Sequence, residues 1–343
     1  MMLVDEFPDR TITVRGKTYL YFGGTSYLGL ATHKGFQQLI IEGLTQWGTS
    51  FGSSRNANVK LSVYATAETL LTKWIKAEDV VTVSSGALAG KLVLDYLSKS
   101  NPVFYHYPKT HPAIVAKNSL LLFEANQLHP RLLDHKIEDI VISADAVLAS
   151  EMFSTSFDFL NEIPKHKTIT LLVDESHSIG ILGESGRGIF TEINTNRAIN
   201  TIVVASMGKA LGVSGGFIGG EKTVINSIKN EATFISSSGA NPCYLQAFIR
   251  GQHIYKSQLN LLKANISYLF SQLNERISSS QNENYPVLYF KNEDIYQNLL
   301  EQKIVITSFL YPTYNVPMNR IVITANHTEA DLKILANALN NLI

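Results

Sequence analysis

The feature that most constrains the fold lies between residues 80 and 205, where short, almost continuously apolar runs alternate with stretches whose apolar residues have helical spacing. Apolar runs of this length are typical of strands buried on both faces of a mainly parallel sheet. Their alternation with helices predicts an α/β layer architecture. We expect strands at residues 80–83, 120–123, 147–153, 169–173 and 201–205.

The segments on either side have a different texture. Outside the alternating region the patterns predict a hairpin at 11–22, helices at 35–47 and 67–74, a long helix at 246–277, strands at 287–290 and 304–307, and a last helix capped by Thr328 and Asp331. We therefore expect a large domain over residues 30–250 and a smaller α+β domain built from residues 1–29 and 251–343.

The charge balance excludes some classes of protein. Twenty-nine basic residues face 29 acidic ones, charged residues make up 17% of the chain and hydrophobic residues 45%. This composition argues against a disordered chain and against a protein that mainly binds nucleic acid. The single cysteine, Cys243, excludes an internal disulfide and fits a reducing compartment. Neither a signal peptide nor a membrane span is visible, so we expect a cytoplasmic protein without a membrane partner.

An acid and a histidine stand at the end of one predicted strand. Asp174 follows the strand directly, and His177 comes three residues later in DESHSIG. Ligands of open α/β sheets bind beyond the carboxyl ends of the strands, so both residues are well placed for a site. Taken alone, Asp174 could instead have the purely structural role of capping a turn. A DESH helicase would need a G-x-x-x-x-G-K-[ST] loop, which neither Gly-Lys dipeptide fits, and a metal site would need a second cluster of ligands.

A lysine follows a later strand. Lys209 lies in the Gly-rich sequence SMGKALGVSGG, where an apolar frame would lower the pKa of its amine and suit it to form a Schiff base. A lysine on the protein surface is the alternative.

Residues 81–97 predict a strand, a Ser-Ser-Gly turn and a helix start that suits a phosphate. A phosphate-binding helix start, a strand-end Asp and then a Lys is the order that a pyridoxal phosphate (PLP) enzyme needs.

The chain resembles the α-oxoamine synthase family of fold-type I PLP-dependent enzymes, which includes 8-amino-7-oxononanoate synthase, a biotin-pathway enzyme. The family motifs occur in order as YLGLA (27–31), DESHSIG (174–180), GESGRG (183–188) and SMGKALGVSGG (206–216), with a closing segment at 311–331. The resemblance implies a mostly parallel sheet sandwiched by helices plus a smaller α+β domain. It also implies an acyltransferase that condenses an amino acid with an acyl-CoA thioester, working as a homodimer with shared active sites.

The resemblance implies a role for each matching residue. Lys209 would form the Schiff base with the cofactor and act as acid and base at the substrate α-carbon. Asp174 would pair with the pyridine N–H, and His177 would bond the phenolic oxygen. The other implied contacts are His111 stacked on the pyridine ring, Ser85, Gly86, Ala87 and Ser206 at the phosphate side, Ser154 near the ring oxygen, Ser237 at the neighbouring subunit's phosphate, and Arg320 with Thr25 at the substrate carboxylate.

Several positions depart from the family pattern. Thr25 stands where the family has Asn, Ala87 and Gly90 replace an aromatic residue and an amide, and the family's N-terminal helix is largely missing. These departures concern the substrates more than the cofactor. An aminotransferase, or another enzyme acting at Cα on the same fold, therefore stays open. A non-catalytic partner subunit is disfavoured because Lys209 is present.

Overall fold

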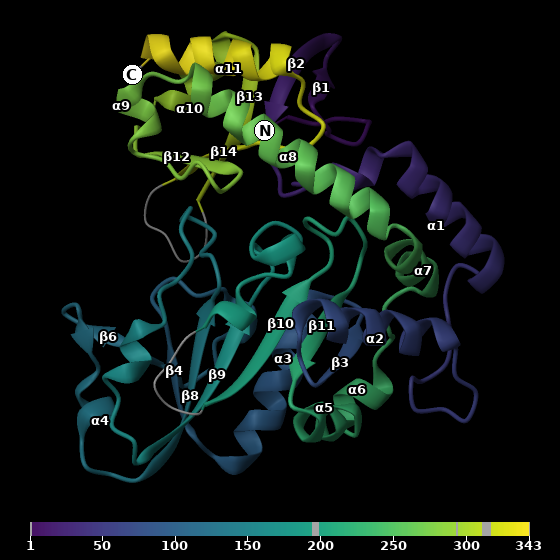
Figure 1. Ribbon diagram of the computed structural model, residues 1–343, viewed down its shortest axis with the longest axis vertical. Helices are drawn as coiled ribbons and strands as arrows, with labels where there is room; N and C mark the ends of the chain where they lie inside the picture. The colour runs from purple at the N-terminus through teal and green to yellow at the C-terminus, as the bar shows by residue number, and fades with distance from the viewer. Residues whose placement is uncertain (1, 194–198, 293, 311–316, 343) are drawn as a thin grey trace.

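Two sheets organise the chain, as the computed structural model shows for residues 2–193, 199–292, 294–310 and 317–342 (Figure 1). The large sheet has the strand order β3-β11-β10-β9-β8-β4-β5. Its neighbours pair in parallel, except that β11 runs antiparallel to β10 and β3. The predicted mostly parallel sheet is therefore confirmed. The strands are β3 (Asp79–Val83), β4 (Val103–His106), β5 (Leu120–Leu121), β8 (Glu138–Asp145), β9 (Lys167–Asp174), β10 (Asn200–Ser206) and β11 (Gly216–Gly220).

The small sheet joins the two ends of the chain. Its order is β1-β2-β13-β14-β12, and the parallel pairing of β2 with β13 brings the N-terminal hairpin against the C-terminal strands. The separation into two sheets supports the predicted domain boundaries near residues 30 and 250, which stay a prediction. The strands are β1 (Thr11–Val14), β2 (Lys17–Phe22), β12 (Val287–Phe290), β13 (Ile304–Phe309) and β14 (Met318–Val322); β6 (Phe123–Glu124) and β7 (Gln127–Leu128) form a separate hairpin.

Helices cover both faces of the large sheet. Side chains alternate along a strand, so Val80 joins a core that contains Leu71, whereas Val81 joins another that contains Leu92. Helix α2 therefore packs on one face and α3 on the other. The helices are α1 (Lys34–Trp47), α2 (Ser62–Ile75), α3 (Gly86–Leu97), α4 (Pro130–Leu133), α5 (Lys222–Lys229), α6 (Ala232–Ser236), α7 (Pro242–Arg250), α8 (Gln252–Gln272), α9 (Glu275–Ser278), α10 (Ile295–Glu301) and α11 (Glu329–Leu342).

One hydrophobic core links the two sheets. The cluster that contains Leu71 and Phe217 also contains Phe22, Ile306 and Leu335 from the small sheet and its helix α11. Figure 1 shows α8 running from the small sheet down to α7, beside α1. The two sheets are thus held by shared apolar packing. No helix within these described ranges is long and apolar enough to cross a membrane.

Three expected elements differ in the structure. The strand predicted at 120–123 is divided between β5 of the large sheet and β6 of the separate hairpin. The strand predicted at 147–153 is wrong: the strand is β8 (Glu138–Asp145), and the apolar residues after it form a loop. That loop is apolar because residues 146–149 are buried, and a short apolar run alone does not distinguish strand from buried loop. The long helix predicted at 246–277 is divided into α7, α8 and α9, with Gly251 between the first two.

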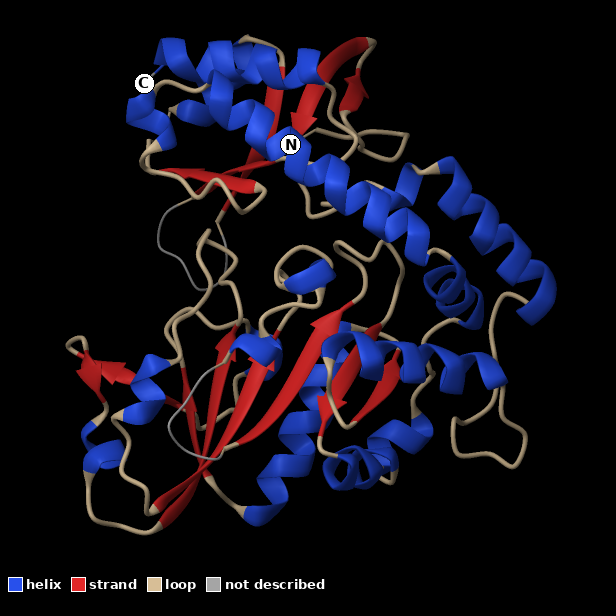
Figure 2. Cartoon of the chain, in the orientation of Figure 1, coloured by secondary structure: helices blue, strands red, loops and turns tan. Residues whose placement is uncertain are grey.

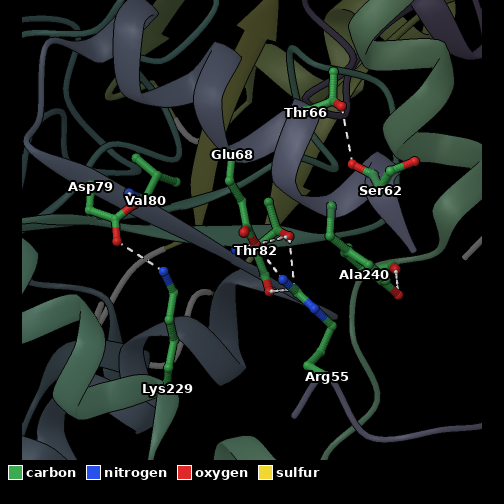
Figure 3. A network of polar contacts seen from close by, with 10 residues as sticks. Arg55, Ser62, Thr66, Glu68, Asp79, Val80, Thr82, Lys229 and Ala240 are labelled. Atoms are coloured by element: carbon green, nitrogen blue, oxygen red, sulfur yellow. Dashed lines mark hydrogen bonds and ion pairs between the residues drawn. The ribbon is translucent and has the colours of Figure 1, made fainter. Parts of the chain in front are cut away.

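A buried ion pair fixes the Gly/Ser-rich segment that follows α1. Arg55, at the end of this segment, bonds Glu68 of α2 at 2.8 Å and the Thr82 carbonyl of β3 at 3.0 Å (Figure 3). The Glu68 carboxylate also accepts from the Thr82 N–H at 2.8 Å. The guanidinium lies 3.8 Å from the centre of the Tyr64 ring. Loop, helix and strand are therefore tied together close to the start of α3.

Candidate active site

The carboxyl ends of the parallel strands point toward the small sheet (Figure 2). Asp145 ends β8, Asp174 ends β9 and Ser206 ends β10. Asp145 stands opposite Asp174 in the strand register. Because this edge is where open α/β sheets bind ligands, the predicted strand-end site coincides with the junction between the two sheets.

Lys209 lies three residues beyond β10. Burial is the main cause that lowers the pKa of its amine, and the Arg320 charge lowers it further, whereas Asp174 and Asp145 act to raise it. The net effect is a lowered pKa. A larger fraction of the amine is then unprotonated near neutral pH, which is what a nucleophile or a base at this position needs.

Five predicted residues come together here. His111 interacts electrostatically with Asp174 and Lys209, and His177 interacts with Lys209, Arg320 and His111. Burial is the largest cause that lowers the pKa of both histidines, that of His177 well below its usual value. The site therefore offers neutral imidazoles beside an amine, a carboxylate and a guanidinium.

The loop that carries His111 is held by a residue without a role in the sequence-based prediction. The buried carboxylate of Asp145 accepts from the His111 N–H, at 3.1 Å and 3.2 Å to its two oxygens. Burial raises the pKa of Asp145 well above its usual value, and the Asp174 charge adds to this effect. The sequence does contain a pattern that could have predicted this role, namely a second acidic residue at the end of an apolar strand. It was missed because the strand was expected after Asp145, whereas the structure places it before Asp145.

The helix start predicted to suit a phosphate lies beside Ser206. Ser85 is the N-cap of α3, and its hydroxyl oxygen accepts from the Leu88 N–H at 3.1 Å. A Cβ atom on Gly86 would lie 2.8 Å from the Ser206 Cβ, so only glycine allows this approach. Ala87 is exposed at the same helix start. The first amides of a helix have no partner within the helix, which suits them to an anion.

Arg320 reaches the site from β14 of the small sheet. It is 6% exposed, and its guanidinium donates to the Gly24 carbonyl at 3.0 Å and to the Ala149 carbonyl at 3.4 Å. The buried Nε has no partner among the described residues. Thr25 follows the carbonyl that Arg320 bonds. A buried cation whose guanidinium bonds main-chain carbonyls is suited to receive a carboxylate.

Two predicted residues make no hydrogen bond to these five in the described part of the chain. Ser154 is exposed and lines a surface hollow of about 490 Å³ together with Tyr107 and Lys109, and the hydroxyl of the neighbouring Thr155 donates to the Asp145 carbonyl at 2.6 Å. Ser237 directly follows α6, and its hydroxyl donates to the Phe234 carbonyl at 3.2 Å. The roles predicted for both serines stay predictions, and that of Ser237 concerns a neighbouring subunit.

One departure from the family pattern has a steric reason. A Cβ atom on Gly90 would lie 2.4 Å from the Ala113 carbonyl oxygen. Helix α3 thus packs directly on the turn Pro112–Ile114, which follows His111. The amide expected from the family pattern has no room at this position, because the His111 loop occupies it.

Comparisons with known proteins agree on the fold. A family model described as aminotransferase class I and II matches residues 155–339. The 8-amino-7-oxononanoate synthases of Petrotoga mobilis and Fervidobacterium nodosum are 27% and 25% identical to this chain, each covering 94% of it and 87% of the relative. A serine palmitoyltransferase from S. paucimobilis superposes with a TM-score of 0.84 at 17% identity, covering 99% of this chain and 92% of that one. An 8-amino-7-oxononanoate synthase from Francisella tularensis gives 0.72 at 21% identity, covering 94% and 97%.

Proposed function

Because the chain belongs to the aminotransferase class I and II family, we propose that it is a PLP-dependent acyltransferase of the α-oxoamine synthase type. It condenses an amino acid with an acyl-CoA thioester and releases CoA and CO₂ to give an amino ketone. One observation carries the proposal: Lys209, three residues beyond β10, interacts electrostatically with Asp174 at the end of β9 and with Arg320 of β14, and the pKa of its amine is lowered. Relatives named 8-amino-7-oxononanoate synthase favour acyl transfer.

The residues at this edge fit the cofactor. Asp174 is a carboxylate that can keep a pyridine nitrogen protonated, and its Oδ1 is oriented by the Ser176 N–H at 2.8 Å. The start of α3, with Gly86 against Ser206, offers amides for the phosphate. His111 is the neutral ring available to cover the pyridine. When bound, PLP supplies an electron sink that stabilises negative charge at the substrate α-carbon.

The side chains then have separate tasks. Lys209 would hold the cofactor through its amine, and the same amine would be the base that takes the proton from the substrate α-carbon. Burial is the main cause that lowers the pKa of this amine, which favours its unprotonated form. Arg320 binds the substrate carboxylate through its guanidinium, whose Nε has no partner among the described residues. Thr25 lies beside this carboxylate site and is a candidate for the choice of amino acid.

The test is release of free CoA by the purified protein from a panel of amino acids and acyl-CoA thioesters. Turnover with at least one pair is expected, together with a PLP absorption band that borohydride traps on Lys209. Lys209→Ala should abolish both trapping and turnover, whereas Lys91→Ala, an exposed lysine on α3, should keep both. A protein that binds PLP but releases no CoA across the panel would contradict the acyltransferase proposal.

An aminotransferase is the second candidate, because Thr25 replaces the expected Asn at the substrate side. It predicts conversion of the bound cofactor to its amine form by an amino acid alone, and regeneration by a 2-oxo acid. This cycle needs no CoA, so the same panel without thioesters separates the two activities.

We also propose a cytoplasmic homodimer with shared active sites. Ile41 and Leu44, on one face of α1, are 54% and 39% exposed, which supports an apolar contact with a second copy. The one cysteine, Cys243, is buried as a free thiol, which fits a reducing compartment. Light scattering should give twice the chain mass of 38.0 kDa; a monomer at micromolar concentration would contradict the dimer.

A further inference from the structure

Two buried tyrosines hold His177. The Tyr27 hydroxyl lies 2.9 Å from Nδ1 of the His177 ring, and the Tyr285 hydroxyl donates to the His177 carbonyl at 3.0 Å. Tyr27 is 0% exposed and Tyr285 2%, whereas His177 is 9% exposed. The other ring nitrogen, Nε2, makes no hydrogen bond to the part of the chain that the structure describes. The ring therefore has one occupied and one open nitrogen.

Both tyrosines belong to the small-sheet side of the junction. Tyr27 follows β2, and its carbonyl accepts from the Ala325 N–H, just beyond β14, at 2.9 Å. Tyr285 lies two residues before β12. His177 itself comes from the loop after β9 of the large sheet. The orientation of a site histidine on one sheet is thus set by residues that are fixed to the other.

The direction of the Tyr27 bond follows from acceptor strength. A neutral imidazole has one donor and one acceptor nitrogen. The unprotonated nitrogen is a strong acceptor, whereas a phenolic oxygen, conjugated with its ring, is a weak one. If both tyrosines donate, each proton meets a strong acceptor of His177, namely Nδ1 and the carbonyl. If Nδ1 donated instead, the Tyr27 oxygen would have to accept.

The ionisation of both groups is compatible with this direction. Burial raises the pKa of Tyr27, so its hydroxyl keeps the proton that it donates. Burial, together with the charges of Lys209, Arg320 and His111, holds the pKa of His177 well below its usual value, so its ring is neutral and Nδ1 can accept. The influence of these three charges on its pKa also indicates that His177 belongs to the site.

We infer that Tyr27 is a positioning residue that donates to Nδ1 of His177 and thereby fixes the Nε2–H tautomer, with the N–H directed to an anionic oxygen of the ligand. The last clause rests on the proposed function, in which that oxygen is the phenolic oxygen of PLP. The tautomer itself is a property of the protein alone. Tyr27 needs no contact with substrate or cofactor to act in this way.

The experiment records nitrogen resonances of the full-length protein labelled with [¹⁵N]histidine, with and without PLP. His177→Ala identifies the signals. In the wild type we expect Nε2 protonated and Nδ1 unprotonated. In Tyr27→Phe, which keeps the ring but loses the donor, we expect the preference for this tautomer to fall about tenfold, the worth of one hydrogen bond. PLP affinity, titrated by absorbance, should fall in the same variant.

Tyr255→Phe is the matched control, because it also removes one buried hydroxyl, which bonds the Leu211 carbonyl at 2.7 Å. It should leave the His177 tautomer unchanged. An Nδ1–H tautomer in the wild type, or an unchanged tautomer in Tyr27→Phe, would overturn the inference. If Tyr27→Phe does not fold, 3-fluorotyrosine labelling strengthens the donor and should shift Nδ1, and no shift would count against it. Failure of the wild type to bind PLP would contradict the proposed function and leave the tautomer result standing.

Discussion

Asp145 and Asp174 stand opposite each other at the ends of neighbouring parallel strands, and both are buried. Burial first, and then the charge of Asp174, raises the pKa of Asp145 well above its usual value. Its carboxyl group still accepts from the His111 N–H. Asp145 thus serves the site as an acceptor for the His111 loop, and Asp174 as the carboxylate that faces Lys209.

The Asp145 side chain can be tested by comparing an amide with a truncation. Asp145→Asn keeps an acceptor for His111 and removes the repulsion with Asp174, so stability at pH 8 should equal or exceed that of the wild type. Asp145→Ala leaves the His111 N–H without its acceptor and should lose about 1–3 kcal/mol. Urea unfolding of the protein without cofactor measures both. Equal losses in the two variants would contradict the acceptor role.

Gly90 tests the steric limit on the family pattern. In Gly90→Asn the new Cβ would meet the Ala113 carbonyl oxygen at 2.4 Å. The His111 loop must then move, at a cost of about 1–3 kcal/mol, and PLP affinity should fall. Gly52→Ala is the control, since a Cβ there meets nothing within 4 Å, and its effect should stay within about 0.5 kcal/mol. A stable Gly90→Asn protein with unchanged PLP affinity would show that the loop is not held at this contact.

Glu175 predicts a dependence of stability on pH. It is 1% exposed, and burial is the main cause that raises its pKa from 4.5 to about 7. The folded protein holds this proton more tightly than the unfolded chain, so its stability falls as the pH rises from about 4.5 to about 7, and the loss persists above. At about 1.4 kcal/mol per pH unit the total is about 3 kcal/mol.

Glu175→Gln cannot ionise, so its stability relative to the wild type should rise by up to about 3 kcal/mol between pH 4.5 and pH 8. Urea unfolding of both proteins across this range gives the difference directly. A difference that is independent of pH would mean that Glu175 titrates alike in the folded and unfolded chains.

The Arg55–Glu68 pair is expected to matter for stability, because its side chains are only 11% and 12% exposed. Glu68→Ala leaves the cation and the Thr82 N–H without their acceptor and should cost about 3–5 kcal/mol. Glu68→Gln keeps an acceptor oxygen and should cost less. Asp95→Ala, which breaks the exposed pair with Lys91, should change stability by no more than about 0.5 kcal/mol. Thermal unfolding ranks the three variants, and an Asp95 effect as large as that of Glu68 would contradict this order.

The sequence predicts those site residues that belong to a recognisable motif and also lie at or just beyond the end of a predicted strand. Asp174 ends an apolar strand and Lys209 lies three residues beyond another, so their place at one edge of the sheet follows from the topology of parallel strands. Asp145 has the same position on β8 but was hidden because the buried apolar loop after it was assigned to the strand. Local pattern does not separate a buried strand from a buried loop, since both exclude water.

Contacts between residues that are distant in the sequence could not be predicted from the local sequence pattern. Tyr27 belongs to a motif, but its contact with His177 depends on how the two sheets meet. From the sequence, Gly90 indicates only that the amide side chain of the family pattern is missing. The close approach of the Ala113 carbonyl oxygen, seen in the structure, explains why a glycine stands there. Ser154 matches a family serine by its neighbours in sequence, and its role stays a prediction. The contacts of Tyr27 and Gly90 each depend on residues distant in the chain.

The pairing of β2 with β13 also has a consequence for biosynthesis. Phe22 ends β2 and Ile304 begins β13, so the hairpin is made roughly 280 residues before its partner strand. At about 5–20 residues per second this interval is roughly 15–60 s. Throughout that time the nascent hairpin has an unpaired strand edge and an apolar face exposed to association with other chains, whereas the large sheet has all its strands once Gly220 of β11 has been made. The ligand site is therefore incomplete until Arg320 of β14 has been made.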